Sequence, residues 1–111
     1  MGGEKLRVDA RRLIENDNND VFASAASTWE IAIKAASGKL DAPEQLEDAI
    51  LRTRFVPLPI SIKHTQQAAW LPSHHGDPFD RMLVAQAQIE RCHLVTRDRH
   101  LSVYDVTTIR A

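Results

Sequence analysis

The segment from Asp77 to Ile89 most constrains the fold, because it is a helix with too many apolar residues to lie on a surface. Asp77 followed by Pro78 is the favoured order of an N-cap and a first helical residue. The residues after them, FDRMLVAQAQI, place apolar side chains around much of the helix. Such a helix must be covered by other elements, so the chain needs a core packed around it.

Short apolar runs alternate with helical segments along the rest of the chain. The pattern predicts helices over 9–15, from Ser27 to Gly38, from Pro43, from Ser61 to near Trp70 and from Asp77. Strands are predicted over 21–24 and 93–96, with a last edge strand over 103–109. Residues 55–60 are extended but not central, because they contain two prolines. This alternation predicts one α/β domain over 1–111 with a mostly parallel sheet.

The composition agrees with a soluble globular domain. The 111 residues are 43% apolar and 26% charged, which excludes a disordered or fibrous chain. The formal net charge of -1 provides no global attraction for nucleic acid, so binding of that kind needs a local basic patch. Cys92 is the single cysteine, and no apolar run approaches the roughly 20 residues that span a bilayer. Since MGGEKLRVD also lacks a signal-peptide core, a cytoplasmic protein without a membrane segment is predicted.

Three acidic residues are expected at the carboxyl edge of the predicted sheet, where ligands bind in α/β folds. Glu30 lies in the helix after the strand over 21–24, Asp80 lies in the first turn of the helix from 77, and Asp98 follows the strand over 93–96. Carboxylates that converge from separate segments are natural oxygen ligands for Mg²⁺ or Mn²⁺.

Each acid also has an explanation that involves no ligand. Glu30 has the spacing of a capping-box partner for Ser27, and Asp77 is most simply the N-cap of its helix. Asp80 would favour the helix dipole, and Asp98 would suit a turn. From the residues alone, both interpretations stay open.

Other polar residues near this edge are weaker candidates. Thr96 and Arg97 flank it and could contact a phosphate, although a threonine at a strand end is more often structural. The adjacent His74 and His75 lack the spacing of a zinc motif. Cys92 is expected to be a small buried hydrophobic residue.

Three motifs together resemble one known family. SAASTWEIAIKAASGKL (24–40), LPSHHGDPFDRMLVAQAQ (71–88) and LVTRD (94–98) are similar to the VapC-type PIN domains, the toxin ribonucleases of toxin–antitoxin pairs. With the RRLIENDNNDVF lead-in, the resemblance covers almost the whole chain. It implies a three-layer α/β/α fold with a short, mostly parallel sheet.

The resemblance also implies roles for the acids. Glu30, Asp80 and Asp98 match the family's catalytic, metal-binding carboxylates, Thr96 matches a nearby hydroxyl, and Asp77 matches the helix cap. Arg81 and Arg97 would contact RNA phosphate, although a surface arginine is the simpler interpretation. Similar proteins use Mg²⁺ or Mn²⁺ to cut RNA, and a cognate antitoxin neutralises most of them.

One departure from the family pattern is expected to matter. Family members open with a short apolar strand that ends in Asp-Thr, followed by an apolar helix, and MGGEKLRVDARRL resembles neither. The chain is therefore expected to begin one strand and one helix late, without the first catalytic aspartate. A trimmed or misassigned start, a degraded toxin, and a gap filled by a second copy or a partner chain are the alternatives. We favour an oligomer or a rearrangement that covers the exposed sheet edge.

Two functions follow from this sequence. The first is a metal-dependent endoribonuclease toxin, impaired by the missing segment. The second is a catalytically inactive remnant that acts as a protein-binding or self-assembling module. A generic α/β domain whose acids are all caps ranks last.

Overall fold

The computed structural model describes residues 7–74 and 76–111. The MGGEKL opening and His75 lie outside the described residues, as do the expectations about them. Helices and short strands alternate in the order α1 (Val8–Glu15), β1 (Phe22–Ser24), α2 (Ala25–Ala36), α3 (Leu46–Leu51), β2 (Val56–Leu58), α4 (Ile62–Trp70), α5 (Pro78–Glu90), β3 (Leu94–Thr96), η1 (Arg99–Val103) and β4 (Thr108–Arg110). This alternation confirms the α/β class.

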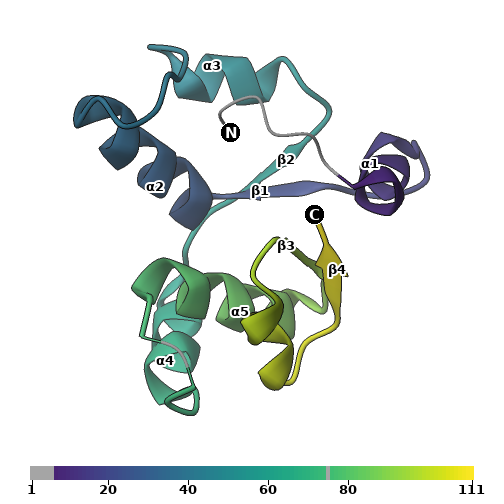
Figure 1. Ribbon diagram of the computed structural model, residues 1–111, viewed down its shortest axis with the longest axis vertical. Helices are drawn as coiled ribbons and strands as arrows, with labels where there is room; N and C mark the ends of the chain where they lie inside the picture. The colour runs from purple at the N-terminus through teal and green to yellow at the C-terminus, as the bar shows by residue number, and fades with distance from the viewer. Residues whose placement is uncertain (1–6, 75) are drawn as a thin grey trace.

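The strands form two parallel pairs. β1 pairs with β2, with Phe22 opposite Val56, and β3 pairs with β4, with Leu94 opposite Thr108. Within the described residues each strand has a single neighbour, so the one sheet that we predicted is two separate two-stranded sheets. Figure 1 shows the β1–β2 pair with α2 and α3 in one half of the molecule, and the β3–β4 pair with α4 and α5 in the other.

Pro57 takes part in β2 without breaking the ladder. The Val56 N–H donates to the Val21 carbonyl at 2.8 Å, and alternate residues of a strand point their polar groups to opposite sides. Pro57, which has no N–H, therefore presents its nitrogen to the side away from β1. The prediction that this segment is not a central strand is confirmed.

Several predicted boundaries were wrong by a few residues. α2 begins at Ala25 because Ser24 caps it, and not at the predicted Ser27, so Glu30 lies in the second turn and there is no Ser27–Glu30 capping box. α3 begins at Leu46 without a side-chain cap, later than the predicted Pro43. The predicted edge strand over 103–109 is instead the end of η1, a connection and β4.

The core lies mainly in the half that contains α5. A cluster of buried residues joins α4, α5, β3 and η1, and its members are Ala68, Leu71, Val84, Ala85, Ala87, Leu94, Leu101 and Tyr104. Large apolar side chains of the other half, such as Trp29 and Leu51, are exposed. Within residues 7–74 and 76–111, no helix is long and apolar enough to span a bilayer.

Candidate functional site

The start of α5 is capped as the sequence predicts. The Asp77 carboxylate accepts hydrogen bonds from the backbone N–H groups of Phe79 at 2.8 Å and Asp80 at 3.2 Å, and Pro78 is the first helical residue. These bonds satisfy N–H groups that a helix leaves without a partner at its first turn. The Asp80 carboxylate is not needed as the cap, and its half-buried side chain lies in the first turn of the helix.

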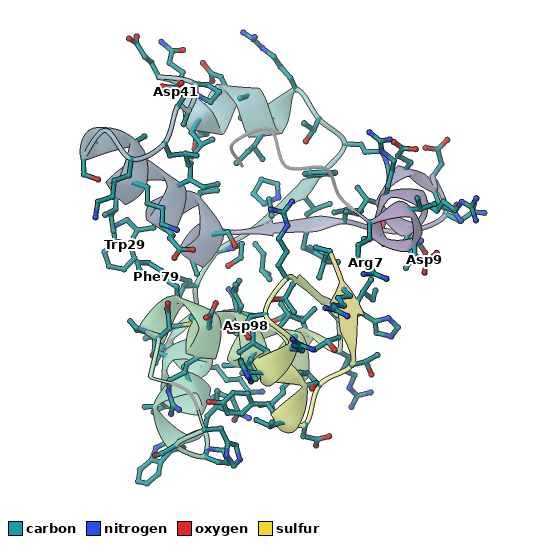
Figure 2. All side chains as sticks on the ribbon, viewed as in Figure 1. Arg7, Asp9, Trp29, Asp41, Phe79 and Asp98 are labelled. Carbon is teal, nitrogen blue, oxygen red and sulfur yellow. The ribbon has the colours of Figure 1, made fainter. Side chains whose placement is uncertain are left out.

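α2 meets the start of α5 through two aromatic rings. Trp29 and Phe79 lie in an edge-to-face arrangement with ring centroids 5.3 Å apart. Figure 2 shows the two labelled side chains next to each other. Glu30 directly follows Trp29 in the sequence, and Asp80 directly follows Phe79. The aromatic contact therefore brings the backbone that carries two of the three predicted acids to the same region of the molecule.

Glu30 has a basic neighbour on its own helix. Its carboxylate lies 3.6 Å from the Lys34 ammonium one turn later, and the Glu30 side chain is 34% exposed. An ion pair this accessible to water contributes at most about 1 kcal/mol. The contact leaves Glu30 available for exchange with another cation or a ligand.

Asp98 is held by the turn that follows β3. Its carboxylate accepts the His100 N–H at 2.9 Å and lies 3.1 Å from the His100 ring, so it caps η1. The Asp98 N–H donates to the Thr96 hydroxyl at 3.1 Å. The turn interpretation of Asp98 is therefore confirmed, and Thr96 helps to shape that turn.

The three predicted acids do not form a metal site as they stand. Among residues 7–74 and 76–111, no three His, Cys, Asp or Glu side chains are grouped so that they could hold a metal ion. Glu30, Asp80 and Asp98 come from neighbouring elements but do not meet in this arrangement. No reaction step is therefore assigned to an ion between them.

The two arginines of the predicted substrate surface have different environments. The Arg81 guanidinium donates to the carbonyls of Ala68, Leu71 and Pro72 at 2.8–2.9 Å, at the carboxyl end of α4. These contacts favour a structural role for Arg81 over phosphate binding. Arg97 is exposed between Thr96 and Asp98, where a ligand can reach it.

Sequence reasoning missed a buried polar network behind these acids. Ser24, His64 and Gln86 are the buried polar side chains of the described residues, and they are connected by hydrogen bonds. Gln86 had a signal in the sequence, since it is a polar residue in the middle of the apolar run MLVAQAQI. His64 also had one, because it lies three residues after the helix cap Ser61.

Cys92 follows the end of α5, and His74 lies in the loop that precedes α5. Cys92 is partly exposed rather than fully buried, and its own burial, followed by the nearby Glu90 carboxylate, raises the pKa of its thiol. The thiol is therefore mostly protonated and a weak nucleophile at neutral pH. The His74 ring packs edge-to-face on Tyr104 at 5.4 Å, which is a packing role.

An open apolar groove adjoins Trp29. Its volume is about 730 Å³, and it lies between α2, α3 and the β1–β2 pair. Its lining includes Trp29, Ile50, Leu51, Pro57 and Leu58. The groove is apolar, so it cannot by itself bind a phosphate group.

Comparison with known proteins agrees with the resemblance of the motifs. Residues 1–106 match the PIN domain family. The chain is also similar to Ribonuclease VapC16 of Mycobacterium tuberculosis, with 35% identity over 71 residues that cover 59% of this chain and 50% of that protein. The match thus spans about half the length of this curated relative. No solved structure matches.

Proposed function

This chain belongs to the PIN domain family, and we propose that it is an endoribonuclease of the toxin component of a toxin–antitoxin pair. The similarity to a VapC ribonuclease supports the activity and the RNA substrate. The observation that carries the proposal is the Trp29–Phe79 contact, which places Glu30 and Asp80 on two helices that touch. In this proposal the protein acts in the cytoplasm and is neutralised by a cognate antitoxin.

Three carboxylates would carry the activity. Glu30, Asp80 and Asp98 are proposed to act together with Mg²⁺ or Mn²⁺, the divalent ions that suit oxygen ligands. Because they do not form a metal group as they stand, RNA or a partner chain would have to draw the Asp98 turn toward Glu30 and Asp80, whose helices already touch. The Glu30 side chain is 34% exposed and can exchange its Lys34 partner for such an ion, which supports the proposal.

Substrate contacts are proposed at the turn after β3. Arg97 is exposed there and carries a guanidinium that can bind a phosphate through two hydrogen bonds. The Thr96 hydroxyl accepts the Asp98 N–H and can still donate its own hydrogen to a phosphate oxygen. Arg81 is assigned the lesser part, because its guanidinium already binds three carbonyls.

Cleavage of RNA by matched variants tests the proposal. We expect the wild-type chain to cut RNA in the presence of Mn²⁺, and Asp80→Asn to lose most of that activity because a carboxylate becomes an amide. Asp77→Asn is the control three residues away, since asparagine caps a helix as well as aspartate does. Equal cleavage by wild type and Asp80→Asn would mean that Asp80 has no part in catalysis.

A second function is favoured by the split sheet. β1 and β3 each have one neighbour among the described residues, so each leaves one edge of backbone groups that a further strand can pair with. The alternative is therefore a catalytically inactive module that binds an antitoxin or a second copy of itself. Calorimetry with Mg²⁺ and Mn²⁺ separates the two functions, because the inactive module should bind neither ion.

A further inference from the structure

A chain of side-chain hydrogen bonds, most of them buried, links the start of α2 to α5 and α4. Ser24, His64 and Gln86 are 8%, 3% and 2% exposed. The Ser24 hydroxyl donates to the Gln86 side-chain oxygen. The Gln86 nitrogen lies 3.4 Å from both the Pro59 carbonyl and His64 Nδ1, and His64 Nε2 lies 2.8 Å from the Glu90 carboxylate.

The neighbours of His64 and of Ser24 determine which atom donates and which accepts in this chain of hydrogen bonds. The Ser61 N–H donates to His64 Nδ1 at 3.0 Å, so Nδ1 is the acceptor and Nε2 carries the hydrogen that goes to Glu90. At the other end, Ser24 Oγ accepts the Ala26 N–H at 3.0 Å as the cap of α2 and donates its own hydrogen to Gln86. The Gln86 amide is therefore held in one orientation by its partners.

This network is a costly way to fill the interior. A buried hydroxyl or amide loses its hydrogen bonds to water. Each new hydrogen bond inside the protein then contributes a net stabilisation of only about 1 kcal/mol. Apolar side chains of similar size would fill the same space without that cost, whereas a satisfied polar network specifies one arrangement of the elements. The arrangement that it specifies here is the position of α2 on α5.

Two contacts fix α2 on α5. Ser24, at the start of α2, meets Gln86, and Trp29 meets Phe79. Trp29 comes after Ser24 in the sequence, whereas its partner Phe79 comes before Gln86. The two helices therefore run in opposite directions where they touch. One contact alone would let α2 pivot, and the second sets its angle. Glu30 directly follows Trp29, and Asp80 directly follows Phe79. The angle between the two helices therefore also sets the separation of Glu30 and Asp80.

We propose that Gln86 is a positioning residue, which holds the start of α2 against α5 through Ser24 and so sets the separation of Glu30 and Asp80. His64 and Glu90 act behind it by keeping the Gln86 amide in the orientation that accepts from Ser24. Gln86 is 2% exposed and does not touch substrate. The catalytic part of this inference rests on the proposed nuclease function, whereas the geometric part does not.

The test compares two glutamines of the same helix. Gln86→Leu removes the Ser24 contact, whereas the control Gln88→Leu removes bonds on another side of α5, to Gln67 at 2.7 Å and the Asp105 carbonyl at 3.3 Å. The geometric readout is the nuclear Overhauser effect between the Trp29 indole and the Phe79 ring, whose centroids are 5.3 Å apart. The catalytic readout is kcat and KM for RNA cleavage, measured beside the unfolding midpoint in urea.

We expect Gln86→Leu to weaken the Trp29–Phe79 signal and to lower kcat by about a hundredfold with KM unchanged, as a misplacement of roughly 1 Å can do. Gln88→Leu should keep the signal and the kcat of the wild type. Ser24→Gly removes the same bond from the other side, and because glycine is a tolerated N-cap it keeps the test open if Gln86→Leu does not fold.

A folded Gln86→Leu or Ser24→Gly chain with a Trp29–Phe79 signal of wild-type intensity would overturn the proposal. So would a kcat that falls equally in Gln86→Leu and Gln88→Leu, because the loss would then follow general stability. If the wild-type chain cuts no RNA, the proposed nuclease function fails, and the Trp29–Phe79 signal still decides the role of Gln86.

Discussion

Asp77 and Asp80 show how two residues of the same type, three positions apart, differ in role. Asp77 accepts two backbone N–H groups and begins α5, whereas Asp80 lies in the first turn beside the α2 contact. Glu30 and Asp98 each have a local partner, in addition to the catalytic role that we propose for them. At this scale a local contact does not exclude a function, because a partly exposed partner can be exchanged.

The capping role of Asp77 predicts a stability effect. Asp77→Ala leaves the Phe79 and Asp80 N–H groups without their acceptor and should lower the free energy of unfolding by about 1 kcal/mol. Asp77→Asn should stay within a few tenths of a kcal/mol of the wild type, because its side-chain oxygen still caps. Urea denaturation measures both, and an Asp77→Ala chain as stable as the wild type would contradict the role.

At the scale of elements, helix and strand types follow the sequence closely, whereas their ends do not. α5 begins where the Asp77-Pro78 pair predicts, because that pair has no competitor nearby. The cap of α2 lies three residues earlier than predicted, at Ser24 instead of Ser27, since Ser24 is also a good cap and the alanines after it are strong helix formers. β4 was placed too early because the pattern did not reveal the η1 turn that Asp98 caps.

Arg81 joins two elements and predicts a stability effect at this scale. Its guanidinium binds carbonyls at the end of α4, which a helix leaves without partners. Arg81→Met should lower the free energy of unfolding by about 3 kcal/mol, because bonds from a charged donor are lost.

The control for Arg81 is Arg11→Met. Arg11 makes an exposed ion pair with Glu15 at 3.5 Å, and its loss should change the free energy of unfolding by less than about 1 kcal/mol. Chemical denaturation of both variants gives the comparison. Equal stability of the two would show that the Arg81 contacts do not support the fold, and phosphate binding would then be the better assignment.

At the scale of the whole molecule, two halves meet through few elements. One half has the buried core around α5, and the other has the open groove beside Trp29. Exposed large apolar side chains occur in both halves, for example Trp70 on α4 and Trp29 on α2. The β1–β2 and β3–β4 pairs remain separate sheets within the described residues. Since backbone groups at an open strand edge seek partners, this arrangement favours association with another chain.

β3 has one edge without a strand neighbour in the part of the chain that the structure describes, and this open edge predicts self-association. Leu94 donates to Thr107 and Thr96 accepts from Ala111 on the β4 side, so the alternate residue Val95 presents its backbone groups to the open side. Sedimentation velocity should therefore show reversible association that grows with protein concentration. Val95→Lys should shift the protein toward monomer, because a lysine on an edge strand discourages pairing.

Val103→Lys is the matched control for that experiment. Val103 is an exposed valine at the end of η1 and belongs to no strand, so the same substitution there should leave association unchanged. A wild-type chain that stays monomeric at every concentration would contradict the prediction. If Val95→Lys and Val103→Lys reduce association equally, the cause is the change in net charge rather than the β3 edge.

The sequence by itself determined the α/β class, the capped start and burial of α5, the edge character of the proline-containing strand and the family. These properties depend on residues close together in the chain or on motifs in a fixed order. Only the tertiary structure decided that Gln86 meets Ser24, that Arg81 binds the end of α4 and that the acids do not form a metal group as they stand. Those contacts join residues far apart in sequence, and their distances depend on how whole elements pack, which no local pattern encodes.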